Sequence, residues 1–172
     1  MTKEEILYNV SLTENVYSEE KDIDFKAKRL KLIKWIEDKK SDTQGFVATR
    51  DKSIYVVWRG SESKKDFQND ASIDKVPFLN EGEKVHIGFK SCWESVVGDT
   101  YDAIDIALEN LQGETTDIVV SGHSLGGAMA VLVAAELNTC PLGVSGGLHT
   151  FGQPRVGTKG FLSALEGMKY YR

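Results

Sequence analysis

A serine between two glycines is the residue best placed for chemistry. Ser124 lies in the segment GHSLG, residues 122–126, after the apolar run 118–120 and before the apolar segment 128–135. This order predicts a strand, a sharp turn and a buried helix, with glycines that let the helix pack closely against the turn. The turn would expose the serine hydroxyl at the end of a sheet, where it can attack an acyl carbon. The alternative is a glycine-rich turn with an inert serine.

Such a serine needs a histidine to take its proton and an acid to orient that histidine, in the chain order serine, acid, histidine. Beyond Ser124 the carboxylates are Glu136 and Glu166, and the histidine is His149. Glu136 lies well along the predicted helix, and His149 lies inside an apolar run that reads as a buried strand. None of them suits the triad, so we expect the sequence to stop before its acid and base.

The patterns in the first third of the sequence predict part of the scaffold that positions the serine. The first third reads as helical, with a second helix from about Asp24 to Asp38, and residues 1–40 are expected to pack on a sheet as an N-terminal helical part. Runs 43–49 and 53–58 flank a short polar turn, which is typical of a β-hairpin.

Strands and helices then alternate: a helix over 89–111, a strand over 117–121, a strand over 147–151, a helix over 158–167 and a strand from Lys169. This alternation favours an α/β fold with a mostly parallel central sheet flanked by helices, in a single domain over 1–172. Ligands on such sheets bind at the carboxyl ends of the strands, where Ser61 and Ser124 are both expected.

Composition excludes several classes of partner. The net charge is −5, from 21 Lys and Arg against 26 Asp and Glu, and the basic residues are dispersed, so no nucleic acid partner is expected. No apolar run is long enough for stable membrane insertion, and the N-terminus does not resemble a signal peptide, so a cytoplasmic location is expected. Cys92 and Cys140 are expected to be reduced, and the scattered histidines predict no metal site and no cofactor.

Four motifs occur in a family-specific order: WRGSES at 58–63, VHIGF at 85–89, VSGHSLGG at 120–127 and FGQPRVG at 151–157. In this order they resemble the lipase class 3 family of α/β-hydrolases, which includes fungal triacylglycerol lipases and feruloyl esterases. The resemblance runs from about Gln44 to Arg172. It implies the α/β-hydrolase fold, here without its C-terminal strands.

The resemblance also implies roles for individual residues. Ser124 corresponds to the nucleophile, and the backbone N–H of Leu125 to one donor of the oxyanion hole. Ser61 corresponds to the second donor, through its N–H and its hydroxyl, although a serine there could instead cap the polar loop. His86 resembles a structural histidine, and His123 occupies a variable position from which it is expected to point away from the serine hydroxyl.

Family members continue past Tyr170 to the catalytic Asp and His, so this chain alone is expected to be inactive. The segment 61–76, which corresponds to the family's lid, carries seven charged residues and scarcely any coherent apolar face. The leading interpretation is a serine carboxylic-ester hydrolase for a small ester or lipid substrate. The alternative is a non-catalytic lipase-like binding or signalling protein.

Overall fold

A six-stranded sheet organises the computed structural model, which describes residues 2–60, 74–114, 117–140 and 143–172. The strand order is β1-β2-β3-β6-β7-β8, and β4 and β5 form a separate two-stranded sheet. The strands are β1 (Lys31–Asp38), β2 (Thr43–Arg50), β3 (Ser53–Trp58), β4 (Lys75–Pro77), β5 (Lys84–His86), β6 (Asp117–His123), β7 (Gly147–Phe151) and β8 (Tyr170–Tyr171). Strands β1, β2 and β3 pair antiparallel, whereas β3, β6, β7 and β8 pair parallel.

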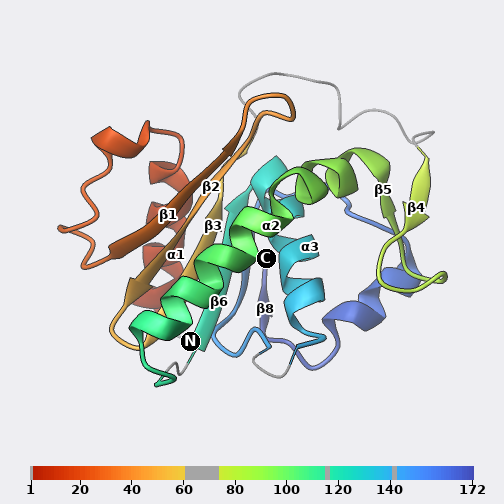
Figure 1. The fold of residues 1–172 in the computed structure, drawn as a ribbon. Coiled ribbons are helices and arrows are strands. Elements are labelled where there is room, and N and C mark those ends of the chain that lie inside the picture. Colours follow the sequence, from red (N-terminus) through yellow and green to blue (C-terminus); the bar gives the residue numbers. More distant parts are fainter. Residues whose placement is uncertain (1, 61–73, 115–116, 141–142) are drawn as a thin grey trace.

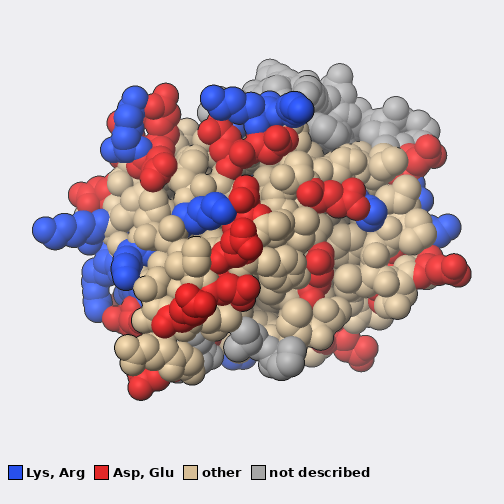
Figure 2. Space-filling view, viewed as in Figure 1, with Lys and Arg blue, Asp and Glu red and all other residues tan. Residues whose placement is uncertain are grey.

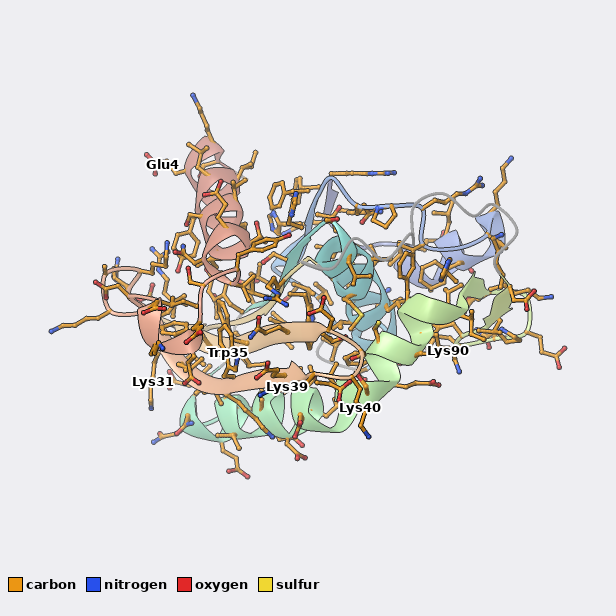
Figure 3. The ribbon with its side chains drawn as sticks, turned by 90° about the horizontal axis from the view of Figure 1, so that it is seen from above. Glu4, Lys31, Trp35, Lys39, Lys40 and Lys90 are labelled. Atoms are coloured by element: carbon orange, nitrogen blue, oxygen red, sulfur yellow. The ribbon has the colours of Figure 1, made fainter. Side chains whose placement is uncertain are left out.

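Helices cover both faces of this sheet (Figure 1). Helix α1 (Lys3–Asn15) lies on one face, and α2 (Ile87–Asn110) and α3 (Leu125–Leu137) lie on the other, as the view from above shows in Figure 3, where Glu4 marks the start of α1. Two short 3-10 helices, η1 (Glu20–Asp22) and η2 (Lys159–Leu165), complete the described elements. The expected α/β-hydrolase layering is therefore present.

Side chains alternate between the two faces along the hairpin strands, as a sheet that is buried on both sides requires. Ile54, Val56 and Trp58 of β3 pack toward α2 and α3, whereas Val57 packs toward α1 with Leu12. Nearly every residue of α3 is buried, which explains the continuous apolar sequence after Ser124. The core therefore fixes the strand and the helix on either side of Ser124.

The prediction for the second helix was wrong. Residues Lys31–Asp38 form strand β1, and the preceding residues form turns that end with Arg29 at φ 57°. The pairing of β1 with β2 shifts register between Leu32 and Lys34, so Ile33 is an extra residue in the ladder. Across this irregularity Leu30, Ile33 and Ile36 recur at a spacing of three, which imitates a helix.

Residues 1–40 are therefore part helix and part sheet. The predicted helix over 158–167 is the short η2 instead, and the hairpin, the long helix α2 and strands β6, β7 and β8 are confirmed.

Candidate active site

Ser124 adopts the strained backbone of a sharp strand-to-helix turn. Its φ is 53° and its ψ is −121°, in a region that residues with a side chain rarely occupy. The Ser124 N–H donates to the carbonyl oxygen of Phe151 at 2.9 Å, and its own carbonyl accepts from Gly127 N–H at 2.9 Å. The neighbouring strand and the first turn of α3 thus hold this conformation, and the predicted sharp turn between strand and helix is confirmed.

Helix α3 begins directly behind the serine. Leu125 is its first residue, and its side chain is buried in the core. The first N–H groups of a helix have no acceptor within the helix, and they lie at the positive end of the helix dipole. The Leu125 N–H is therefore suited to stabilise an oxyanion that develops beside Ser124, and its role as a donor stays a prediction from the resemblance.

The end of β3 lies against the same helix. A Cβ atom on Gly126 would lie 2.3 Å from the carbonyl oxygen of Trp58 and 2.5 Å from that of Arg59. Only a residue without a side chain permits this approach. Strand β3 and helix α3 consequently bring the segment that leads to Ser61 beside Ser124, although Ser61 itself lies outside the described residues.

Arg59 anchors this segment to the hairpin. Its N–H donates to the carbonyl oxygen of Gln44 at 2.9 Å, and its guanidinium donates to Asp42 Oδ1 at 2.9 Å. The Arg59 side chain is only 11% exposed, so this ion pair is shielded from solvent and is less screened than a surface pair. Sequence analysis missed this contact because the two strands of the hairpin separate the two residues, and the motif that contains Arg59 does not include Asp42.

Each histidine that could serve as a base occupies a different position in the fold. His86 caps α2, where its Nδ1 accepts from Gly88 N–H at 3.0 Å, which fits the expected structural role. His149 lies buried in β7, stacked on Tyr171 with ring centroids 5.0 Å apart. Burial lowers the pKa of both imidazoles, and in each case it is the largest cause. His123 is exposed and shares a hydrogen bond with Tyr17 at 2.7 Å.

Glu136, the carboxylate nearest after Ser124 in sequence, is tied to α2 instead of the site. It accepts from Trp93 Nε1 at 2.5 Å and from the Tyr101 hydroxyl at 3.2 Å. Burial raises the pKa of Tyr101, and the Glu136 carboxylate adds to this shift. Within the described residues, no hydrogen bond joins the Ser124 hydroxyl to a histidine.

The described residues contain no cluster of metal-ligating side chains, and no helix in them has the length and apolarity to cross a membrane. Acidic side chains gather along the exposed side of α2 (Figure 2). These are Glu94, Asp99, Asp102, Asp105 and Glu109. That face is unsuited to a polyanion.

The sharp turn at Ser124 and the order of the strands agree with the family that the four sequence motifs resemble. The family model described as lipase (class 3) matches residues 55–172. The chain belongs to the class 3 lipase family. It is 35% identical over 151 residues to a lipase of Rhizopus niveus, an alignment that covers 77% of this chain and 37% of that protein. It is also 35% identical to a lipase of Rhizomucor miehei, over 83% of this chain and 41% of that protein.

Solved lipase structures share the fold. One is a triacylglycerol lipase whose catalytic centre is formed by a serine protease triad, and it superimposes with a TM-score of 0.83 at 30% identity. The superposition covers 99% of this chain and 71% of that one. The chain spans about two fifths of the length of the curated relatives it matches.

Proposed function

We propose that the protein containing this chain is a serine carboxylic-ester hydrolase that works through an acyl-enzyme. The observation that carries the proposal is the turn at Ser124. This turn joins the carboxyl end of the central strand β6 to the start of helix α3, and Ser124 has a strained φ of 53° there. Strain of this kind has to be maintained by the surrounding fold, and it exposes a hydroxyl that a simple glycine turn would not need.

The chain supplies the nucleophile and part of the oxyanion hole. As the Ser124 hydroxyl oxygen attacks the ester carbonyl carbon, its proton passes to a base, which returns it to the leaving alcohol as the C–O bond breaks; water then releases the acyl group from Ser124 as the carboxylic acid. The Leu125 N–H, with a donor at Ser61, stabilises the charge on the carbonyl oxygen, and a single such donor is worth roughly 3 kcal/mol.

A histidine base and its acid complete the reaction, and we propose that residues other than His86, His149 and Glu136 provide them. His86 caps a helix, Glu136 bridges α2 and α3, and His149 is buried within the sheet. A serine protease triad forms the catalytic centre of one structural relative, which supports a histidine base and an acid in this protein as well. The substrate that fits this chemistry is a small carboxylic ester or a lipid.

Hydrolysis of p-nitrophenyl butyrate tests this proposal in the protein expressed from its complete reading frame. We expect saturable hydrolysis that the substitution Ser124→Ala reduces by at least about 10³-fold. Ser145→Ala is the matched control, because Ser145 lies in the loop before β7 at the amino end of the strand. Equal rates in the wild type and the Ser124→Ala variant would favour a non-catalytic lipase-like binding protein.

A further inference from the structure

Tyr17 reaches the active site from the opposite end of the sequence. It follows the C-cap residue Val16 of α1, and its N–H donates to the carbonyl oxygen of Glu14 at 3.2 Å. Leu12 and Val16 are fully buried in the core on this face of the sheet, beside Phe46. The Tyr17 side chain therefore starts from a fixed position.

The Tyr17 phenol contacts the residue that precedes the nucleophile. Its hydroxyl and His123 Nδ1 lie 2.7 Å apart and share a hydrogen bond. The two rings meet edge to face, with centroids 5.8 Å apart and an interplanar angle of 62°. Gly152 lies on another side of the imidazole, where a Cβ atom would be 3.6 Å from His123 Nε2, an ordinary van der Waals distance. The imidazole is thus held by a defined partner although it is exposed.

The same hydroxyl lies against the segment that leads to the oxyanion hole. A Cβ atom on Gly60 would lie 2.1 Å from the Tyr17 hydroxyl oxygen and 3.1 Å from Ser124 Cβ. The phenol therefore occupies the space that a side chain at position 60 would fill. Gly60 is held between Tyr17 and the nucleophile, and it directly precedes the expected donor Ser61.

We propose that Tyr17 and His123 form a positioning pair that holds Gly60 in place beside Ser124. The inference rests on the proposed ester hydrolysis, and it assigns to the pair a role in the geometry of the oxyanion hole. Donors of that hole bind the tetrahedral intermediate more strongly than the planar substrate, so misplacing them lowers kcat and leaves KM nearly unchanged.

Kinetics of p-nitrophenyl butyrate hydrolysis test the pair in the protein from its complete reading frame. We expect Tyr17→Phe and His123→Phe each to lower kcat by about tenfold with KM within about twofold. The double variant should be no slower than either single variant, because both remove the same hydrogen bond. His123→Asn keeps a polar group near the position of Nδ1 and should retain kcat within about threefold.

Tyr8→Phe is the matched control. Tyr8 lies on α1, the helix that leads to Tyr17, and its hydroxyl donates to the carbonyl oxygen of Lys28 at 3.1 Å, whereas the atoms nearest to a Cβ on Gly60 belong to Tyr17, His123 and Ser124. A general loosening of α1 would affect both tyrosine variants alike. We expect Tyr8→Phe to leave kcat unchanged.

Amide hydrogen exchange at Gly60 gives a readout that does not need turnover. We expect exchange at Gly60 to accelerate by about tenfold in Tyr17→Phe and not in Tyr8→Phe. If the wild type shows no Ser124-dependent hydrolysis, the proposed function fails, and the exchange data alone then show whether Tyr17 and His123 position Gly60. An unchanged kcat in a hydrolysing protein, or an unchanged Gly60 exchange in either case, overturns the pair.

Discussion

Gly122 and Gly126 approach so closely across the turn of Ser124 that a Cβ atom on Gly122 would lie 2.0 Å from the carbonyl oxygen of Gly126. The contact is with backbone, which cannot rotate away as a side chain can. The strand and the helix on either side of the nucleophile are therefore in direct contact, and the strained serine conformation depends on that contact.

Gly122→Ala should consequently destabilise the fold by about 2–3 kcal/mol, because the added methyl group overpacks the turn. Gly98→Ala is the control, since Gly98 lies in α2 and a Cβ atom there meets nothing within 4 Å. That variant should be more stable by about 0.5–1 kcal/mol, as expected for alanine in a helix. Urea unfolding of the two variants measures the difference, and equal midpoints would contradict the close packing.

His149 should make stability depend on pH. Burial lowers its pKa from the ordinary value of 6.5, so the unfolded chain binds a proton more readily than the folded chain. The contribution is therefore fully present above about pH 6.5 and is lost as the pH falls toward the lower folded pKa.

His149→Phe, which preserves stacking on Tyr171, tests this dependence. Between about pH 7.5 and 5.5 the wild type should lose more stability than the variant, by at most about 1.4 kcal/mol per pH unit. The pKa of His86 is also lowered, but His86 is present in both proteins, so its contribution to the pH dependence of stability is the same in both and drops out of the difference. Parallel stability curves would show that His149 does not titrate differently on folding.

The 172-residue chain alone should hydrolyse p-nitrophenyl esters no faster than its Ser124→Ala variant. Within the part of the chain that the structure describes, no histidine shares a hydrogen bond with the Ser124 hydroxyl, so the serine has no base to activate it. An oxyanion hole without a triad still gives about 10³-fold over water, and this residual rate should be equal in both proteins. Faster Ser124-dependent turnover would require a base within this chain, and His123 would be the first residue to substitute.

The complete protein should prefer dispersed esters to long-chain triglyceride emulsions. The segment 61–76, most of which lies outside the described residues, carries seven charged side chains. These side chains would have to stay hydrated if the segment lay on lipid, which leaves little apolar area to bury. Activity measured against rising triglyceride concentration should saturate smoothly. A sharp increase at the solubility limit would show a working lid, for which Phe67, Ala71 and Ile73 are the candidate apolar stripe.

Local sequence patterns predicted those parts of the site whose conformation depends on neighbouring residues in the sequence. The glycines around Ser124, the apolar run of β6 and the apolar helix α3 each carry their own signal, so the turn and its position were confirmed. Strand β1 was mistaken for a helix because an extra residue near Ile33 shifts the ladder, and only the partner strand reveals that shift.

Long-range contacts were beyond such patterns. The Tyr17 hydroxyl meets His123 across 106 positions of sequence, and neither residue has a periodicity or a motif that predicts the other. Arg59 and Asp42 meet only because the hairpin folds back on itself. Contacts of this kind follow from the assembled sheet, so a single sequence does not predict them.

Trapping of the acyl-enzyme tests most directly whether Ser124 is the nucleophile. The protein from its complete reading frame should be mixed with p-nitrophenyl butyrate, quenched in acid and digested, and the peptides analysed by mass spectrometry. The account predicts a butyryl group on Ser124 at early times, and no butyrylated peptide when Ser124→Ala is treated in the same way. Butyrylation of a different residue, or hydrolysis that persists in Ser124→Ala, would contradict it.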